Sequence, residues 1–573
     1  MKGSGASALV TVLEREGVEV VYGIPGVRNI ALYEAIRRST LRPVLVTNER
    51  AAGFMADAYA RSTGKVGVCA VIPGPGVTNL LSGVGEALLD SSPMVVLMTA
   101  VRKDRHRPFQ AQEIPQVDLV KPLVKRVFRI RQIATLPEVL GSAFRTARTG
   151  EPGPVAVDIP ENILLDSGSF PDYEPLPPLP VGFDEKKFAE IVALLCKARQ
   201  VGIYVGYGAV GARGFIETLA ELLDAPIATT ISGRGIIPED HPRSVGFGFG
   251  PAGNPIAEEI FRLCDTVLAI GCKFGEVATG AYGFRKPRCL IHVDINGEVL
   301  GRNRMADRTL RADAAVFLPR LVDVLASRQI EGKSEGRICR EIARLKEEAT
   351  AHIARLPERQ EAVSPIHLLH RLRSLLPRDA IVTTDSGSHQ FWVAGTFPVY
   401  ESRSLLTPTD FQATGFGIPA AVAAKIAFPE RPVVAITGDA GLLAASMEVL
   451  TAIREGAPIK ILLFHNRRLT MVRAAEEERQ GQGSEMTERL MPDLEALSAA
   501  LSLRHFRIER DAQITEVLAS ALDASDSVLI EAHIPEAEID RYLQERLGVA
   551  SERLPFSLRL RYLAREAWRV VTG

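Results

Sequence analysis

Two segments in the C-terminal half of the chain combine oxygen ligands with small residues in a pattern that suits a metal-bound phosphate. Residues 436–441 read ITGDAG and residues 464–466 read FHN, which places Asp439 and Asn466 at the ends of successive predicted strands. Mg²⁺ prefers oxygen ligands and usually shares them between protein and phosphate. Small residues at a strand-to-helix turn let backbone N–H groups approach phosphate oxygens. The pattern therefore predicts a Mg²⁺ and phosphate site, with a helix-capping role as the alternative for Asp439 alone.

Parallel sheets covered by helices on both faces are the elements that must position these residues. Short apolar runs, such as residues 65–72 (KVGVCAVI) and 92–100 (SPMVVLMTA), alternate with amphipathic helices along the chain. Nearly continuous apolar strands of this kind are typical of doubly wound sheets. A weak internal similarity links the GPG turn at 74–76 to the GDAG turn at 438–441. The predicted fold class is therefore α/β, with three doubly wound parallel-sheet domains.

The domain limits follow from breaks in this alternation. A length of 573 residues allows three or four domains of about 150 residues each. Prolines clustered between residues 171 and 180 predict an extended linker, and a charged helical stretch at 328–362 predicts a second connector. The predicted domains span residues 1–165, 184–328 and 363–545, followed by a tail at 546–573. The basic amphipathic tail is a candidate lid helix, with a helix docked on its own protein or on a membrane surface as the alternatives.

Composition excludes several classes of function. The chain has 68 Lys+Arg against 69 Asp+Glu, a net charge of −1, so no basic field is available to hold nucleic acid. A hydrophobic content of 46% excludes a mainly disordered protein. The six cysteines are scattered without CxxC pairs, which favours free thiols in the cytoplasm. No apolar run is long enough for a membrane span, and no signal peptide is indicated.

The sequence resembles the acetohydroxyacid synthase and pyruvate oxidase group of thiamine-diphosphate enzymes. The resemblance rests on GDAG followed by Asn466, and on landmarks that run nearly from end to end: VYGIPG, VTNERAAGFMADAYAR, PGPGVTN, SSPMVVL, GEPGPVAVDIPEN, HVDINGEVLGRN and GFGIPAAVAAKIA. It implies that the three domains are pyrimidine-binding, central and diphosphate-binding. It also implies thiamine diphosphate and Mg²⁺ as cofactors, and a 2-oxo acid such as pyruvate as substrate.

The same resemblance implies roles for individual residues of the diphosphate-binding domain. Asp439, Asn466 and the main-chain carbonyl of Arg468 would coordinate Mg²⁺, while His389 and Gln390 would hydrogen-bond the diphosphate. Further cofactor contacts are implied for Gly26, Pro75, Asn79, Ser388, Gln412, Thr414, Gly438, Ala440, Gly441 and Met471. For Pro75 and Asn79, a role in packing or turn formation is the alternative.

Two catalytic residues are implied in the first domain. Glu49 matches the glutamate that hydrogen-bonds the aminopyrimidine ring, where a buried carboxyl favours the imino form that deprotonates the thiazolium carbon. Taken alone, Glu49 would be an ordinary carboxylate at a helix N-terminus. Gln112 matches a glutamine that faces the substrate, and taken alone it would be a surface amide.

Several positions depart from the resembling group. Ala440 stands where a glycine lets the backbone approach the diphosphate, so a positive φ there would weaken cofactor binding. Thr414 replaces a bulky apolar residue that supports the bent cofactor. Val277 and Ala475 stand where acetohydroxyacid synthases carry the arginine and tryptophan that select the second 2-oxo acid. These last two changes weaken the case for that specific biosynthetic reaction.

The central unit contains a GxGxxG turn made by Gly206, Gly208 and Gly211, with Asp224 further on. This turn alone is a weak signal for a dinucleotide. In the resembling family this domain holds FAD, binds an adenine nucleotide or stays empty. Because residues 247–254 differ from the flavin-holding segment, the sequence disfavours FAD.

The predicted function is therefore decarboxylation of a 2-oxo acid with transfer of the acyl carbanion to a carbonyl acceptor. The alternative with the same cofactor is a simple decarboxylase or carbon–carbon lyase. The alternative hypotheses from other functional classes are a nicotinamide or flavin oxidoreductase and a catalytically silent homologue. The resemblance also implies a homodimer or homotetramer whose active sites lie at the subunit interface.

Overall fold

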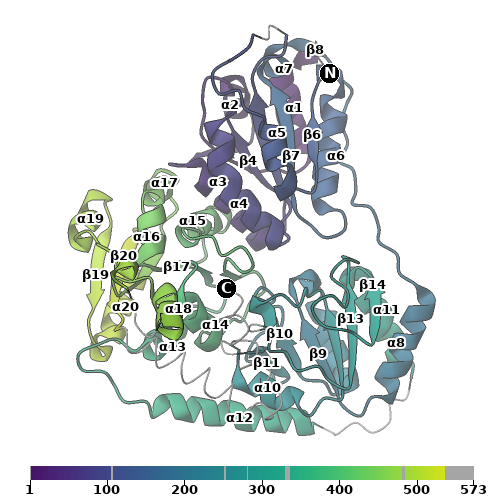
Figure 1. The fold of residues 1–573 in the computed structure, drawn as a ribbon, viewed down its shortest axis with the longest axis vertical. Coiled ribbons are helices and arrows are strands. Elements are labelled where there is room, and N and C mark those ends of the chain that lie inside the picture. The colour runs from purple at the N-terminus through teal and green to yellow at the C-terminus, as the bar shows by residue number, and fades with distance from the viewer. Residues whose placement is uncertain are drawn as a thin grey trace.

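The computed structural model describes residues 2–104, 107–250, 253–279, 282–328, 336–480 and 484–535. Three six-stranded sheets form three separate lobes of the molecule, and every strand pair within these sheets is parallel (Figure 1). The α/β class and the three doubly wound domains are thus confirmed. The predicted tail at 546–573 lies outside the described residues.

The first domain is built on a sheet with strand order β3-β2-β4-β5-β7-β6. Its central strands are buried on both faces, as their Val-rich sequences predict. The strands are β2 (Val20–Gly23), β3 (Arg42–Leu45), β4 (Gly67–Val71), β5 (Met94–Ala100), β6 (Val127–Arg129) and β7 (Pro154–Pro160). The helices are α1 (Gly5–Arg15), α2 (Ile30–Arg37), α3 (Glu49–Thr63), α4 (Pro75–Leu89), α5 (Gln116–Val120), α6 (Leu136–Arg148) and α7 (Glu161–Leu165).

A small antiparallel sheet closes this domain and was not predicted. Strand β1 (Lys2–Ser4) pairs with β8 (Ser167–Ser169), so the chain returns to its own beginning before the proline-rich linker. Each strand has three residues, which is too short for a periodic sequence signal. The pairing extends the first unit past residue 165.

The central domain has strand order β11-β10-β9-β12-β13-β14. Numbered along the chain, this is the 3-2-1-4-5-6 order of dinucleotide-binding sheets, with a switch point between β9 and β12. The strands are β9 (Val201–Val205), β10 (Ile227–Thr229), β11 (Ser244–Phe247), β12 (Thr266–Ile270), β13 (Cys289–Asp294) and β14 (Arg308–Arg311). The helices are α8 (Glu185–Lys197), α9 (Arg213–Leu223), α10 (Pro255–Phe261) and α11 (Ala314–Ala326).

The third domain repeats the strand order of the first, here as β16-β15-β17-β18-β20-β19. The weak similarity between the two sequences therefore reflects a shared topology. The strands are β15 (Ile381–Thr384), β16 (Leu405–Leu406), β17 (Val433–Gly438), β18 (Lys460–His465), β19 (Arg504–Ile508) and β20 (Val528–His533). The helices are α13 (Pro365–Leu375), α14 (Ser388–Thr396), α15 (Gly417–Ala427), α16 (Asp439–Ala445), α17 (Glu448–Arg454), α18 (Thr470–Gln480), α19 (Leu494–Ala500) and α20 (Ile514–Asp523).

One hydrophobic core joins the first and third domains. Helix α15, with the sequence GIPAAVAAKIA, is buried on nearly all sides because it lies between its own sheet and α3. Helices α3 and α4 cross closely at two glycines. A Cβ built on Gly83 would lie 2.5 Å from Gly53 Cα, which no larger residue could tolerate without movement.

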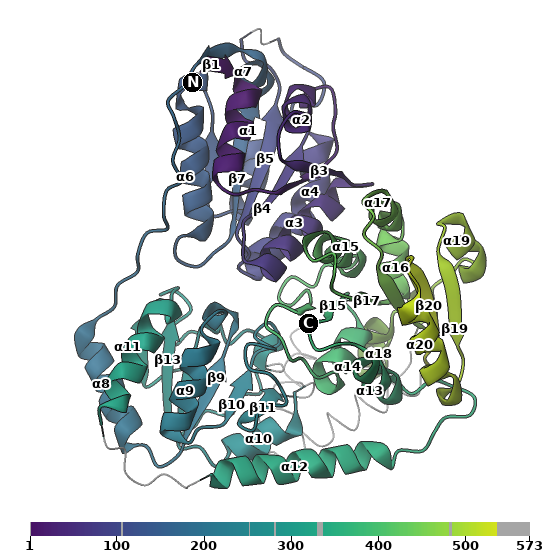
Figure 2. The ribbon, with the colours of Figure 1, turned by 180° about the vertical axis from the view of Figure 1, so that it is seen from behind.

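Helix α12 (Arg337–Ala354) is the predicted charged connector, and in Figure 2 it runs along the lower side of the molecule from the central domain toward the third. Among the described residues, no helix is both long and apolar enough to cross a lipid bilayer.

Candidate functional site

Glu49 is held at the first position of α3 by local helix capping. The side chain of Asn48 caps the helix by accepting the backbone N–H of Arg50 at 2.9 Å. Glu49 is only 7% exposed, and Asn79 Nδ2 from α4 donates to its Oε2 at 3.0 Å. Asn79 itself is exposed. The carboxyl of Glu49 thus lies just beneath the surface, where a ligand can reach it from outside the domain.

The glycine-rich turn before α4 lies against the loop that carries Gln112. Gly74 has φ +68°, and a Cβ there would come within 2.8 Å of the backbone oxygen of Gln112. Pro75 occupies the first turn of α4, where its missing N–H costs nothing. Gln112 is exposed, with φ +70°. Gly26 lies nearby in the fold, because a Cβ on it would contact Ile72. The predicted residues of the first domain therefore gather around the start of α4.

His389 offers a buried, open nitrogen at the carboxyl edge of the third sheet. Its ring lies beside two glycines, since a Cβ on Gly387 or Gly438 would be 2.8 or 3.1 Å from ring atoms. Burial lowers the pKa of His389 to about 4, so the ring is neutral near pH 7. Its Nε2 atom is buried without a hydrogen-bond partner. A polar atom left open in this way fits a ligand oxygen.

The neighbouring amides are used mostly inside the protein. Gln390 Nε2 donates to Thr407 Oγ1 at 2.7 Å, and its Oε1 is the atom left without a partner. The amide of Gln412 donates to the carbonyl of Thr409 at 2.6 Å. Ser388 begins α14, so the backbone N–H groups of that first turn face the same edge. We infer that these amides shape the loop, while backbone N–H groups and His389 remain open to a ligand.

Asp439 is the centre of the candidate metal site. It is 2% exposed, and its carboxylate accepts the N–H groups of Asn466 and Arg467 at 3.1 and 2.5 Å. His465 Nδ1 lies 2.7 Å from the other carboxylate oxygen. Asn466 Oδ1 accepts the backbone N–H of Arg468 at 3.1 Å. The carboxylate of Asp439 and the amide oxygen of Asn466 thus lie at the ends of two adjacent strands, β17 and β18, and they are oxygen ligands of the kind that Mg²⁺ requires.

His465 is a site residue that sequence reasoning missed. In the sheet register, Gly438 on β17 pairs with Phe464 on β18, so the next residues on the two strands also lie side by side. The histidine belongs to the FHN segment, which was the available signal. Among the described residues, no three His, Cys, Asp or Glu side chains form a metal cluster. This agrees with a site that has one carboxylate and otherwise amide and backbone oxygens.

The departures at Ala440 and Thr414 have different structural outcomes. Ala440 lies inside α16 and is not among the residues with positive φ, so its backbone carries no strain. The residue that has no room for a side chain is Gly441, where a Cβ would lie 2.7 Å from the carboxyl carbon of Asp385. Thr414 is exposed, directly before Gly415 with φ +92°.

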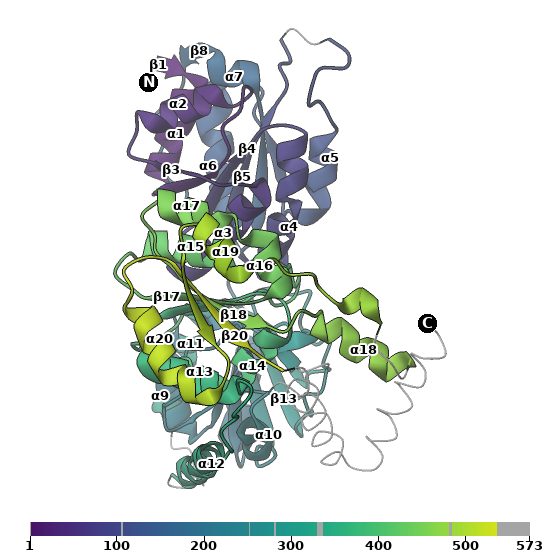
Figure 3. The same cartoon turned by 90° about the vertical axis from the view of Figure 1, so that its left-hand side faces the viewer.

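The structure brings the predicted residues into two groups on one chain. Glu49, Asn79 and the Gln112 loop form one group, and the residues around His389 and Asp439 form the other. Helices α3 and α15 provide the contact between the two domains. Met471 is 36% exposed in the first turn of α18, next to Thr470, whose hydroxyl accepts from Asn466 at 2.7 Å. Helix α18 extends from the third domain in Figure 3.

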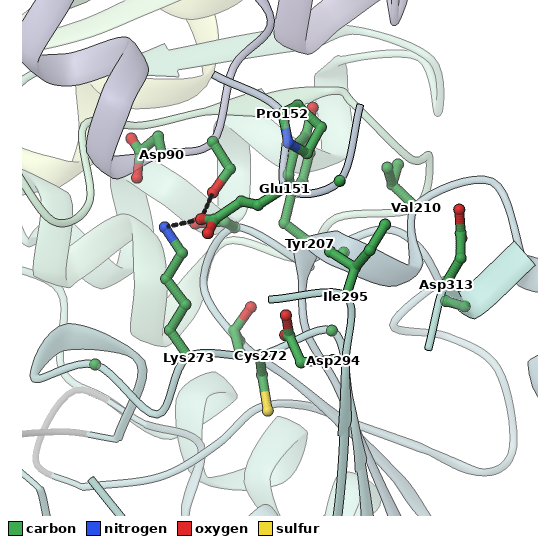
Figure 4. A pocket seen from close by; sticks show the side chains of 18 of the residues that line it. Asp90, Glu151, Pro152, Tyr207, Val210, Cys272, Lys273, Asp294, Ile295 and Asp313 are labelled. Carbon is green, nitrogen blue, oxygen red and sulfur yellow. Dashed lines mark hydrogen bonds and ion pairs between the residues drawn. The ribbon is translucent and has the colours of Figure 1, made fainter. Parts of the chain in front are cut away.

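A cavity of about 270 Å³ opens where the central domain meets the other two, at the carboxyl ends of β9 and β12. It is lined by the carboxylates of Asp90, Glu151, Asp294, Asp313 and Asp410, and by the cations Arg148 and Lys273. Figure 4 shows Lys273 directed toward Glu151, and the two side chains form an ion pair of 2.8 Å.

Two glycines of the central GxGxxG turn, Gly206 and Gly208, serve packing, whereas Gly211 has φ +91° and no heavy atom within 4 Å of a Cβ. A Cβ on Gly208 would lie 2.8 Å from Gly271 Cα. Asp224 ends α9 and pairs with Arg243 at 2.6 Å. The weak dinucleotide pattern is therefore explained in part by structural roles.

Comparisons with known proteins agree with this geometry. Residues 3–120 match the family model for the N-terminal TPP binding domain of thiamine pyrophosphate enzymes. Residues 188–321 match the central domain of these enzymes, and residues 385–532 match their C-terminal TPP binding domain.

Three curated relatives show how far the similarity extends. The acetolactate synthase large subunit of Parasynechococcus marenigrum is 32% identical over 93% of this chain and 88% of its own length. The probable acetolactate synthase large subunit of Methanocaldococcus jannaschii is 33% identical over 93% of this chain and 92% of its own. The isozyme 2 large subunit of Escherichia coli is 32% identical over 93% and 96%. The chain therefore belongs to the thiamine pyrophosphate enzyme family.

Proposed function

We propose that this enzyme uses thiamine diphosphate and Mg²⁺ to release CO₂ from a 2-oxo acid and to join the remaining acyl unit to a second carbonyl compound. The observation that carries the proposal is the site at the edge of the third sheet. There a buried carboxylate, an amide oxygen and an open histidine nitrogen meet at three strand ends. The names of the relatives, acetolactate synthases, support the carboligase reaction.

The protein would supply position and proton control. Bound thiamine diphosphate supplies the carbanion chemistry of the reaction. Asp439 and Asn466, with the carbonyl of Arg468, would hold Mg²⁺, and His389 would contact the diphosphate. Glu49 would hold a proton at the pyrimidine nitrogen, with Asn79 fixing its carboxyl through the observed hydrogen bond. Gln112 would orient the substrate from the loop beside α4.

Product analysis tests the proposed reaction. Purified protein with thiamine diphosphate, Mg²⁺ and ¹³C-labelled pyruvate should release CO₂ and form a branched 2-hydroxy-3-oxo acid, detected by NMR. Omitting the cofactor should abolish both products. Release of CO₂ with free acetaldehyde as the sole organic product would instead support the decarboxylase alternative. Val277, which stands where acetohydroxyacid synthases have an arginine, is the observation that keeps this alternative open.

We further propose that the active site is completed by a second copy of the chain. Four large apolar residues on α16 and around α17 are 42–48% exposed: Leu443, Met447, Leu450 and Ile453. Leu443 lies on α16, which begins at Asp439, and the other three follow at and within α17, so an apolar surface adjoins the candidate metal site. A homodimer or homotetramer would cover this surface. Light scattering after size exclusion should give at least twice the chain mass, and a monomer at all concentrations would exclude the proposal.

A flavin or adenine nucleotide is the second candidate ligand, in the central cavity. The strand order of the central sheet and the cavity at its switch point favour a nucleotide. The five lining carboxylates oppose the diphosphate of FAD. An absorbance spectrum of the purified protein distinguishes a bound flavin from an empty or adenine-binding cavity.

Free cysteines throughout the chain support a cytoplasmic location.

A further inference from the structure

A buried cluster of carboxyl groups lies at the C-terminal ends of α3 and α4, at the far end of these helices from Glu49. Asp57 and Glu86 are fully buried, and Asp90 is 9% exposed. Arg61 is the cation of this cluster, with its Nη1 3.0 Å from Asp90 Oδ2 and 3.4 Å from Asp57 Oδ2. One guanidinium cannot neutralise three carboxylates, so a buried proton is expected among them.

The cluster holds the segment 407–415 of the third domain. Asp90 accepts the backbone N–H of Thr409 at 3.2 Å and also its hydroxyl. Glu86 Oε2 accepts the backbone N–H of Ala413 at 3.1 Å. These bonds tie two points of one loop to α4.

Two further contacts fix the same loop. Arg61 Nη2 donates to the carbonyl of Thr407 at 2.6 Å. The ring of Phe411 lies against α4 at Gly85, where a Cβ would be 2.7 Å from the ring. Helices α3 and α4 therefore contact the loop at points from Thr407 to Ala413.

The opposite side of the loop supports the candidate diphosphate site. Thr407 Oγ1 accepts from Gln390, and Gln412 Oε1 accepts from Ser386 Oγ at 3.0 Å. The N–H of Gly415 donates to Asp385 at 2.9 Å. A shift of the loop would therefore move the residues beside His389.

The surroundings of Glu86 favour this residue as the holder of the buried proton. Its Oε1 is buried without a donor, and Asp90 lies within hydrogen-bonding reach. Burial and the neighbouring carboxylates raise the pKa of Glu86 to about 10. The charged and titratable groups that face it are Asp57 and Arg61 from α3 and Asp90 from α4. Asp410 of the loop also interacts with Asp90.

We propose that Glu86, as a neutral carboxylic acid, is a positioning residue that fixes the 407–415 loop against α4 and thereby orders the diphosphate-binding side of the cofactor site. The inference rests on the proposed function of that site. It also gives α3 and α4 two tasks, because the same helices carry Glu49 and Asn79 at one end and the loop support at the other.

Calorimetric titration with thiamine diphosphate in excess Mg²⁺ tests the proposal. Glu86→Ala removes the acceptor for Ala413 and leaves Asp57 and Asp90 facing each other, so cofactor affinity should fall by about tenfold or more. Glu86→Gln keeps a neutral hydrogen-bonding group and should restore affinity to within about twofold of the wild type. Glu16→Gln is the matched control, because Glu16 is a buried partner of Arg148 away from the loop.

Wild-type affinity in Glu86→Ala would overturn the positioning role. Failure of the wild-type protein to bind thiamine diphosphate would instead overturn the proposed function, so the two failures are distinguishable. If Glu86→Ala does not fold, the pH dependence of thermal stability provides the test.

The sign of that dependence follows from the raised pKa. Between the unfolded pKa near 4.5 and the folded value near 10, the folded protein binds the additional proton, so rising pH destabilises it. Glu86→Gln removes this linkage. The melting temperature of Glu86→Gln minus that of the wild type should therefore increase steadily from pH 6 to pH 9. A constant difference over this range would contradict a neutral Glu86.

Discussion

At the scale of single residues, the site depends on polar atoms that burial leaves for a ligand. The amide of Asn79 holds the carboxyl of Glu49 at the start of α3. His389 keeps an open nitrogen because burial makes its ring neutral and the neighbouring glycines leave it no partner. The carboxylate of Asp439 accepts the backbone N–H groups of Asn466 and Arg467, which follow the next strand. The buried His389 nitrogen without a partner costs folding free energy that a bound cofactor would offset.

Glu49→Gln should separate cofactor binding from turnover. The amide can fill the same space beside Asn79, but it cannot hold the proton at the pyrimidine nitrogen. We expect thiamine diphosphate affinity within about threefold of the wild type and a loss of turnover of about 100-fold or more. Titration calorimetry and CO₂ release measure the two effects. Glu34→Gln, on the exposed face of α2, is the control, and wild-type turnover in Glu49→Gln would refute the assigned role.

Some of these residues could be predicted from the sequence and others could not. Asp439 and Asn466 could be predicted to converge, because the ends of successive parallel strands meet at one edge of a sheet. The contact of His465 with Asp439 depends on the register between β17 and β18, which no local pattern specifies. The carboxyl cluster at Glu86 joins residues more than 300 positions apart, as in its bond to Ala413, and spacing cannot reveal it.

At the scale of elements, helix starts and close helix crossings determine where the site residues lie. Helices α3, α14 and α16 begin at or next to Glu49, His389 and Asp439. The sequence predicted a helix that begins at Glu49 and a strand-to-helix turn at GDAG, but it did not predict α14. It could not predict that the position of Ala440 is helical, because a turn and a first helical turn share the same small residues.

Ala440→Gly should leave cofactor affinity unchanged. Its backbone lies in the helical region, so glycine relieves no strain. Glycine should instead lower the free energy of unfolding by about 0.5–1 kcal/mol through its backbone entropy. Urea denaturation and cofactor titration measure the two quantities. A tenfold gain in affinity would show that this position requires the conformation of a glycine.

The α3–α4 crossing gives a second test at this scale. Gly83→Ala places a Cβ about 2.5 Å from Gly53 Cα, so the helices must separate. We expect a loss of about 1–3 kcal/mol in the free energy of unfolding, measured in urea. Gly214→Ala in α9 is the control, because no heavy atom lies within 4 Å of a Cβ there. Equal stability of the two variants would contradict close packing at the crossing.

At the scale of the whole molecule, two domains of one topology share a core, and a third contributes a nucleotide-binding strand order. The sequence predicted three domains because each alternates strands and helices. The shared core around α15 and the small β1–β8 sheet come from contacts between distant segments, which the alternation does not encode. The proposed active site joins the Glu49 group of one chain to the Asp439 group of a partner chain.

Mixed oligomers of two inactive variants test whether one active site needs residues from two chains. Glu49→Gln and Asp439→Ala chains, co-expressed with different tags, should each be inactive alone. In a mixed dimer one site carries both substitutions and the other carries neither, so one of the two sites is intact. Mixed dimers purified through both tags should recover about half of the wild-type turnover. Inactive mixed dimers that still bind thiamine diphosphate would contradict a site built from Glu49 of one chain and Asp439 of another.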